Sequence, residues 1–271
     1  RQLKSTLEFK EIEGLFSGGQ FNGSSGYEEA ASQGLIAGIN AARKLQGKEG
    51  IVIDRSQGYI GVLIDDLVTK ESHEPYRMMT SRAEYRLLLH QDNADMRLTK
   101  IGYEVGLIDE ERYQKLLKKE EMIEKEIERV EHTNVGTTEA VQALLESYES
   151  TPLTSGTTLA ELIRRPELSY EKIAPIDKHR EELPYDVKEQ VDINIKYDGN
   201  IKRQMRQVEQ FKKLENKRIP ENINYDEIQS LRLEAKQKLN QIRPSSIGQA
   251  SRISGVSPAD VSVLLVYLSS K

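Results

Sequence analysis

The sequence predicts a mainly α-helical protein, in which a C-terminal helical bundle region follows the truncated end of a Rossmann-like α/β domain. A charged fraction of 31%, no Trp and only 4 Phe among 271 residues are typical of a solvated helical protein with thin cores. Two stretches, 109–132 and 187–217, repeat apolar residues three or four apart, the period of an amphipathic helix. We therefore expect three parts, residues 1–66, 67–218 and 219–271.

Composition excludes several classes of site. The chain has no Cys, which excludes disulfides, thiolate metal sites and a cysteine nucleophile within it. Its histidines are scattered without metal-ligand spacing, so we expect no metal site, and we identify no catalytic residue. No apolar run approaches the roughly 20 residues that a membrane span needs, and no signal-peptide pattern opens the sequence. We expect a cytoplasmic protein that does not enter a membrane.

Residues 1–66 show a strand, a glycine loop and a helix in that order. Leu15 and Phe16 end the first strand, and Ser25 with Glu28 forms a capping-box pattern that starts a helix at Gly26. The stretches "IVID" (51–54) and "YIGVLID" (59–65) are predicted as further strands. Three short strands cannot cover such a helix. We therefore expect this part to be the last piece of a larger α/β domain.

The glycine loop has a composition suited to ligand binding. It contains Gly18, Gly19, Gln20, Asn22, Gly23 and Gly26 and leads into Tyr27 and Glu28. Glycines let a backbone approach a ligand, and the free N–H groups at a helix start attract negative charge or a carbonyl oxygen. The spacing is not the dinucleotide fingerprint G-x-G-x-x-G, so a tight connection without a ligand is an equal alternative.

The stretch "YRMMTSRAEYRLLLHQDNADMRLT" (76–99) is rich in arginine. Ser81 and Glu84 form a second capping-box pattern, which predicts a helix with Arg82 and Arg86 on one face. A new helix should start after Asp92 or Asn93 and stop at Gly106. Two interpretations are open. The arginines either form ion pairs with neighbouring acidic residues and hold the domains together, or they bind a phosphate or carboxylate ligand through bidentate hydrogen bonds.

The second long helix carries a basic face. Residues 196–218 hold 8 bases and 3 acids, a local charge of +5 in a chain whose total is −5. Lys202, Arg203 and Arg206 lie off the apolar side of this helix. Such a face is either simply solvated or a track for nucleic acid.

The C-terminal residues read as a helix, a turn at Gly255 and a helix with Ser257 as N-cap and Pro258 in its first turn. The outline resembles a helix-turn-helix. The last helix, however, is apolar nearly all round and lacks side chains that read bases, so we expect it to be buried. This argues against a DNA-binding regulator.

Three segments resemble the glucose-inhibited division protein A family. They are "FSGGQFNGSSGYEEAASQGLIAGINAA" (16–42), "PYRMMTSRAEYRLLLHQDNADMRLT" (75–99) and "RPSSIGQASRISGVSPADVSVLLVYL" (243–268), and the resemblance runs from about residue 8 to the end. The family is the large flavin-binding subunit of the enzyme that modifies the tRNA wobble uridine. The resemblance implies that this chain holds the C-terminal part of a two-domain enzyme.

The resemblance also implies cofactors. FAD would contact the glycine loop, at Gly18, Gly19, Gln20, Asn22, Gly23, Gly26, Tyr27 and Glu28. NADH would be the reductant and methylenetetrahydrofolate the carbon donor for the carboxymethylaminomethyl or aminomethyl group at the uridine 5-position. We expect the chain alone to bind no cofactor and to be inactive.

The partners that the resemblance implies are tRNA, a GTPase and, for the complete protein, a second copy. Candidate tRNA contacts are Arg77, Arg82, Arg86, Lys202, Arg203, Arg206 and Arg252. The terminal helices would bind the GTPase. The alternative is a non-catalytic helical RNA-binding or scaffold module, which would have no use for a glycine-lined helix start.

Overall fold

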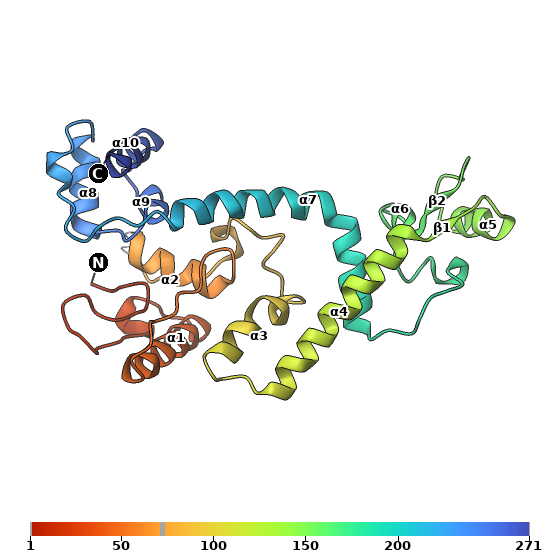
Figure 1. The fold of residues 1–271 in the computed structure, drawn as a ribbon, viewed down its shortest axis with the longest axis horizontal. Coiled ribbons are helices and arrows are strands. Elements are labelled where there is room, and N and C mark those ends of the chain that lie inside the picture. Colours follow the sequence, from red (N-terminus) through yellow and green to blue (C-terminus); the bar gives the residue numbers. More distant parts are fainter. Residues whose placement is uncertain (1, 71–73, 271) are drawn as a thin grey trace. The chain divides into compact units, whose positions relative to one another are not determined.

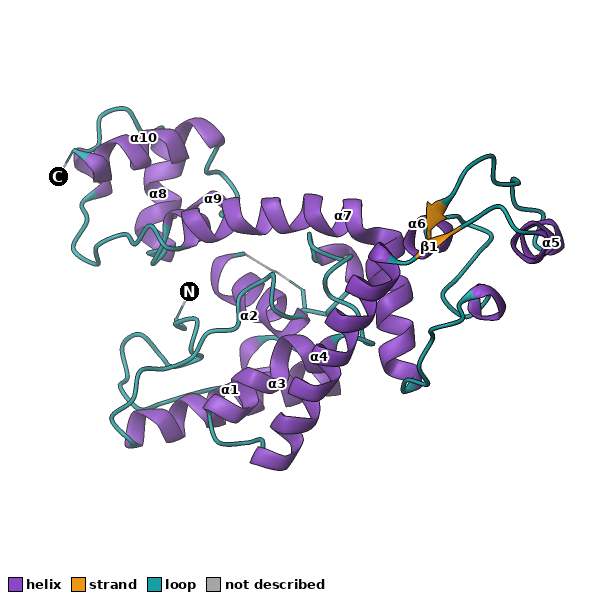
Figure 2. Ribbon diagram, turned by 45° about the vertical axis from the view of Figure 1, so that its right-hand side comes forward, coloured by secondary structure: helices purple, strands orange, loops and turns teal. Residues whose placement is uncertain are grey.

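The computed structural model of the protein describes residues 2–70 and 74–270 and is mainly helical, as predicted (Figure 1). The α-helices are α1 (Tyr27–Leu45), α2 (Tyr59–Thr69), α3 (Ala94–Glu104), α4 (Glu110–His132), α5 (Glu139–Ser147), α6 (Leu159–Ile163), α7 (Tyr185–Glu215), α8 (Leu233–Ile242), α9 (Ile247–Ser251) and α10 (Pro258–Ser269). Four short 3-10 helices are η1 (Gly19–Asn22), η2 (Thr80–Arg82), η3 (Ala174–Ile176) and η4 (Tyr225–Glu227). The strands β1 (Asn134–Val135) and β2 (Thr157–Thr158) pair antiparallel and are drawn orange in Figure 2.

The chain divides into two compact units. The first unit combines Arg1–Leu89 with Met205–Lys271, and the second is His90–Gln204. These borders differ from the expected ones after residues 66 and 218. The reason is that the two ends of the chain pack together in the first unit, where Gln249 donates a hydrogen bond to Ser5 Oγ.

The second unit contains α4 and the first part of α7, the two long helices that the apolar period predicts. α4 starts after Asp109, whose carboxylate accepts a hydrogen bond from the Arg112 N–H at 2.8 Å. The apolar positions of α4 and of the first half of α7 meet in one core. Its buried members from these helices are Ile123, Val130, Val187, Val191 and Ile195. Both predicted helices are therefore confirmed, with ends within two residues.

The terminal bundle in the first unit starts and stops as predicted. Gly255 has a φ of 95°, and Ser257 caps α10 in a capping box with Asp260. The expectation that α10 is buried all round is wrong. Val261 and Leu264 are buried, but Val266 is 68% exposed, because only one side of α10 packs against the bundle core.

The predicted strand at 59–65 is wrong, because these residues lie in helix α2. The run "YIGVLID" is apolar without a clear period, so its length and composition fit either state. Close packing of Gly61 accompanies the helix: a Cβ there would lie 2.2 Å from the Asp54 carbonyl oxygen. Residues 51–54 pass this helix without forming a strand.

Two predicted helix starts are also wrong. Gly26, and not Ser25, is the N-cap of α1, which begins at Tyr27. No α-helix follows Ser81, where the structure has only η2. The side chain of Glu84, which the predicted capping box requires, binds the buried guanidinium of Arg55 at 2.8 Å instead. The helix predicted after Asn93 is confirmed as α3.

Candidate functional site

One buried side chain, Gln33 of α1, fixes the glycine loop, defined here as residues 18–26. Its Oε1 accepts hydrogen bonds from the Gly19 N–H at 3.0 Å and from Asn22 Nδ2 at 2.9 Å. Its Nε2 donates to Ser24 Oγ at 2.7 Å. Asn22 also bonds with Ser17, through its Oδ1 and its Nδ2. The amide of Asn22, predicted to face a ligand, is therefore used inside the loop.

The start of α1 already has a carboxylate beside it. A Cβ at Gly26 would lie 1.8 Å from Glu29 Oε2, so only glycine leaves room for this side chain. Glu29 Oε1 accepts a hydrogen bond from the Met78 N–H at 2.7 Å. That hydrogen bond, with a smaller contribution from Arg77, holds the pKa of Glu29 below its usual value although burial opposes it. The carboxylate at this helix start is thus bonded to the arginine segment through Oε1, while its buried Oε2 has no hydrogen-bond partner among the described residues.

The glycine loop and the arginine segment, residues 76–86, lie side by side. The Tyr76 N–H donates to the Gly23 carbonyl at 2.7 Å, and Ser24 pairs with Tyr76 in a parallel bridge. Arg77 Nε lies 3.4 Å from the Glu29 carboxylate, and the arginine side chain is 62% exposed. Two motifs about fifty residues apart in the sequence thus form one surface.

The other two arginines of the segment differ in their surroundings. The guanidinium carbon of Arg82 lies 4.5 Å from the centroid of the Tyr76 ring, a cation–π arrangement. Its Nε is buried without a hydrogen-bond partner among the described residues. Arg86 is exposed. Arg77 and Arg86 are therefore the arginines of this segment most available to a ligand.

Several side chains of the glycine loop and of the first turn of α1 face outward. Phe21 is 79% and Tyr27 92% exposed, and Gln20 and Glu28 are exposed as well. Gly23 has a φ of 78° and open space around it. Gly18 and Gly19, in contrast, are small because α1 packs on them: a Cβ at Gly18 would lie 3.2 Å from the Gly34 nitrogen. The outward group is the part of the loop that can touch a ligand.

A buried ion cluster lies beneath the arginine segment, and the sequence analysis missed it. Arg55 is 1% exposed and donates to Asp66 at 2.6 Å, Asp65 at 3.0 Å and Glu84 at 2.8 Å. It also donates to the Arg82 carbonyl at 3.1 Å. Although burial opposes it, these carboxylates raise the pKa of Arg55. The two adjacent acids in an otherwise apolar stretch were the available signal.

Arg252 is not an open cation. Its Nε and Nη2 bind the two carboxylate oxygens of Asp65 at 2.7 and 2.8 Å, and its Nη1 binds Glu215 at 2.6 Å. The side chain is 13% exposed and also lies over the ring of Phe211. Two carboxylates thus neutralise this arginine, so we remove it from the RNA contacts.

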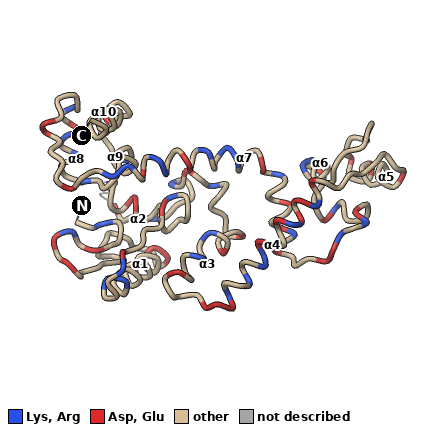
Figure 3. The backbone as a smooth tube through the Cα atoms, in the orientation of Figure 1, with Lys and Arg blue, Asp and Glu red and all other residues tan. Residues whose placement is uncertain are grey.

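The basic face of α7 is solvated, and Figure 3 shows Lys and Arg following the helix. Lys202 forms an (i, i+4) pair with Asp198 at 2.9 Å. Arg203, Arg206 and Lys213 are exposed and make no ion pair within the described part of the chain. These side chains are free to meet an external anion.

Two classes of site are absent from the part of the chain that the structure describes. No group of three or more His, Asp or Glu side chains is placed to hold a metal ion. None of the helices there is long and apolar enough to cross a membrane.

Comparison with known proteins gives consistent matches along the chain. Residues 1–49 match the family model described as glucose inhibited division protein A. Residues 110–205 match the tRNA modifying enzyme MnmG/GidA C-terminal helical domain, and residues 207–271 match the C-terminal helical bundle of the same enzyme.

The chain is also similar to complete proteins and to solved structures. It is 72% identical over 267 residues to the tRNA uridine 5-carboxymethylaminomethyl modification enzyme MnmG of Lachnoclostridium phytofermentans, and 64% identical to that of Caldicellulosiruptor saccharolyticus. The match covers 98% of this chain and 43% of each relative. A crystal structure of Aquifex aeolicus GidA aligns with a TM-score of 0.87 and 43% identity, over 98% of this chain and 42% of that one. The chain thus spans less than half the length of these relatives.

Proposed function

Because the chain belongs to the glucose-inhibited division protein A (MnmG/GidA) family, we propose that it is part of a flavin-dependent enzyme that modifies the 5-position of the tRNA wobble uridine. The relatives' names support the carboxymethylaminomethyl group as the one installed. Within that enzyme, this part serves mainly to bind tRNA and a partner.

One observation carries the proposal: the hydrogen bond from the Tyr76 N–H to the Gly23 carbonyl. It brings the exposed side chain of Arg77 to the loop that the family resemblance assigns to FAD. A phosphate held by Arg77 and Arg86 would keep an RNA strand beside that loop. Phosphate contacts fix position, while base selection is left to the reaction centre.

The outward side of the glycine loop fits a planar cofactor. Gln20 offers an exposed amide and Tyr27 an exposed ring, and the lack of a side chain at Gly23 leaves open space at that position. Asn22 and Gly26 are occupied inside the protein, so we assign cofactor contact to the outward group, which includes Glu28. When bound, FAD would supply the redox chemistry, with NADH as reductant and methylenetetrahydrofolate as carbon donor.

The basic face of α7 extends the proposed tRNA contacts. Lys202 and Arg203 in the second unit and Arg206 in the first are exposed, and each can neutralise a phosphate. Arg82 is half-buried, and its guanidinium lies over the Tyr76 ring. We therefore assign it mainly to holding the arginine segment in place, with the exposed edge of the guanidinium as its only possible contact to RNA.

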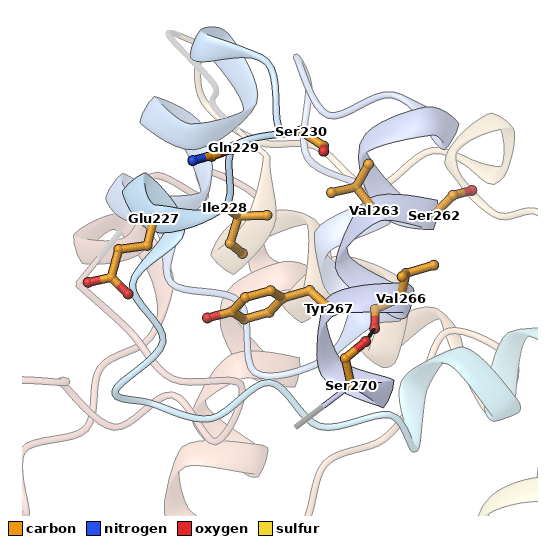
Figure 4. A pocket seen from close by; sticks show the side chains of 9 residues that line it. All are labelled: Glu227, Ile228, Gln229, Ser230, Ser262, Val263, Val266, Tyr267 and Ser270. Atoms are coloured by element: carbon orange, nitrogen blue, oxygen red, sulfur yellow. Dashed lines mark hydrogen bonds between the residues drawn. The ribbon is translucent and has the colours of Figure 1, made fainter.

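The terminal bundle offers a surface for the partner GTPase. A groove of about 460 Å³ lies on one side of α10. Figure 4 shows side chains that line it, among them Ile228, Val263, Val266 and Tyr267. The exposed Val266 gives this groove an apolar edge, which is typical of protein contacts. We propose the GTPase as its occupant, a homodimer for the complete protein, and the cytoplasm as its location.

Salt-dependent binding of a tRNA with a wobble uridine tests this proposal, with duplex DNA as the control ligand. We expect tRNA to bind more tightly than DNA, and the double variant Arg77→Ala/Arg86→Ala to lower the salt slope by about 2, roughly 1 per phosphate contact. Arg112→Ala, an exposed arginine of α4, is the matched control and should leave the slope unchanged. Equal slopes for all proteins would refute the assignment of these arginines.

A non-catalytic RNA-binding scaffold is the second candidate, because the Glu29 carboxylate already lies beside the helix start at the loop. Flavin binding distinguishes the two. If the complete enzyme carrying Tyr27→Ala and Gln20→Ala retains its flavin absorbance and reduction by NADH, the loop has no cofactor role and the scaffold is favoured.

A further inference from the structure

The first unit contains a large cavity that shares no residue with the glycine loop or the α10 groove. Its volume is about 880 Å³. The walls come from residues 3–6 and 10 near the N-terminus, 49–52 after α1, 218–225 after α7, and 242–245 after α8, with Val68 and Gln249 between them. This size suits a ligand such as a nucleotide.

Three cations line this cavity without a carboxylate partner in the described residues. Lys10 Nζ donates to the Ile242 carbonyl at 2.8 Å, and burial lowers its pKa. Arg243 Nη1 donates to the Ile223 carbonyl at 2.8 Å. Arg218 is exposed at the wall. Two carboxylates, Glu49 and Glu221, also line the cavity, but Lys10, Arg218 and Arg243 outnumber them, so the lining favours an anion.

Arg243 occupies a position that favours glycine. It ends α8 with φ 52° and ψ 63°, the left-handed conformation common for glycine after a helix. A side chain there is strained, and this one reaches the cavity wall over the ring of Tyr225, with its guanidinium carbon 5.6 Å from the ring centroid. Strained non-glycine residues of this kind concentrate at ligand sites.

Tyr225 gives a second, independent observation. It lines the cavity and is fully buried, and its hydroxyl has no hydrogen-bond partner in the described parts of the chain. A buried hydroxyl without a partner is unfavourable, and an oxygen-rich ligand within reach would relieve it.

Another part of the lining is a pair of hydroxyl groups held by Gln249. Gln249 Oε1 accepts hydrogen bonds from both the N–H and the Oγ of Ser245 at 2.9 Å, and its Nε2 donates to Ser5 Oγ at 2.9 Å. The hydroxyl hydrogen of Ser245 is thus already donated to Gln249, whereas Ser5, which accepts from Gln249, can donate its own to a phosphate oxygen.

We propose that this cavity is a binding site for a small phosphorylated ligand of nucleotide size. Lys10, Arg218 and Arg243 would hold the phosphate. The apolar side chains of Val52, Ile219 and Ile223 would cover the remainder of the ligand. The phosphate could belong to a free nucleotide or to an RNA terminus, and the experiment separates these sources.

The test is calorimetric titration of the full chain with uridine monophosphate and with inorganic phosphate. We expect both to bind, and Arg243→Gly to weaken uridine monophosphate roughly tenfold, the effect of losing one charge-assisted hydrogen bond. This variant removes the guanidinium while it relieves the left-handed backbone, so it should fold. Lys10→Met should weaken binding similarly.

Two controls match these variants. Glu149→Gly relieves the same backbone conformation, φ 54°, in the second unit, and should leave affinity unchanged. Lys48→Met removes an exposed lysine outside the cavity. If uridine monophosphate, inorganic phosphate and a tRNA all fail to bind, or if Arg243→Gly binds each of them as tightly as the parent does, the proposal is wrong. If Arg243→Gly and Lys10→Met weaken only tRNA and the free nucleotide does not bind, the cavity belongs to the RNA surface and a free ligand is ruled out.

Discussion

Arg252 and Asp65, 187 positions apart in the sequence, form a two-point ion pair, with Nε and Nη2 of the arginine 2.7 and 2.8 Å from the two carboxylate oxygens. Asp65 also accepts a hydrogen bond from Arg55, and Arg252 also donates one to Glu215. The pair therefore joins helix α2 to the end of α7 and to the residue that follows α9. Both partners are nearly buried, at 13% and 11% exposure.

Removing Arg252 should destabilise the first unit. Arg252→Met leaves Glu215 without its cation and Asp65 with Arg55 alone, and breaking a buried pair in this way costs about 3 kcal/mol. Urea unfolding measures the loss. Arg206→Met, an exposed cation of α7, should change stability by no more than about 0.5 kcal/mol. The opposite ranking would mean that the ion pair does not support the fold.

The two glycines Gly61 and Gly34 should respond to alanine in opposite directions. At Gly61 a Cβ would lie 2.2 Å from the Asp54 carbonyl oxygen, so Gly61→Ala must move helix α2 and lower the unfolding midpoint. At Gly34, on the exposed side of α1, a Cβ meets nothing within 4 Å, and Gly34→Ala should stabilise by up to about 1 kcal/mol through helix propensity. Thermal unfolding of both variants checks the contrast.

Glu8 should contribute to stability in a defined pH window. The hydrogen bond from Lys44, then that from the Gly14 N–H, lowers its pKa from 4.5 to about 2. The folded state therefore binds fewer protons at Glu8 than the unfolded state between these values. Its contribution is complete above pH 4.5 and is lost as the pH falls toward 2.

Urea unfolding of Glu8→Gln and the parent across this window measures the effect. The free-energy difference between them should shrink as the pH falls from 5 to 2. A difference that stays constant with pH would show that the carboxylate charge is not what stabilises this region. Glu13→Gln, an exposed neighbour that shares Lys44, is the control.

Val266 should matter for partner binding and not for folding. Val266→Lys places a charge on the apolar edge of the α10 groove at a side chain that is 68% exposed, so the unfolding midpoint should hardly change. Binding of the proposed GTPase partner, measured by analytical ultracentrifugation, should weaken. Leu233→Lys, an equally exposed apolar residue of α8 outside the groove, should not affect it.

The parts of the fold that sequence predicts well are those with local causes. Asp109 and Ser257 cap α4 and α10 with their own side chains, and these helices start where their caps indicate. The arginine segment could not be predicted in this way. There Arg55, about thirty residues earlier, takes both the Glu84 carboxylate and the Arg82 carbonyl, so a tertiary contact replaces the helix.

The sequence predicts the glycine loop and the arginine segment separately, but it does not predict that the two are in contact. The glycines pointed to the loop, and the arginines to an anion-binding surface. No local sequence pattern indicates that the Asn22 side-chain amide donates a hydrogen bond to Gln33, or that Glu29 accepts one from the Met78 N–H. Side chains that bond across distant segments have no periodicity, so sequence patterns do not report them.

The three hydrogen bonds of Gln33 have a consequence for how the loop meets a ligand. Because they fix Gly19, Asn22 and Ser24 from within the protein, the loop holds its shape before any ligand arrives. Association then incurs little loss of loop entropy, and more of the contact energy appears as affinity. A chain with Gln33→Ala would bind through a loop that must first be ordered, with slower association as the visible sign.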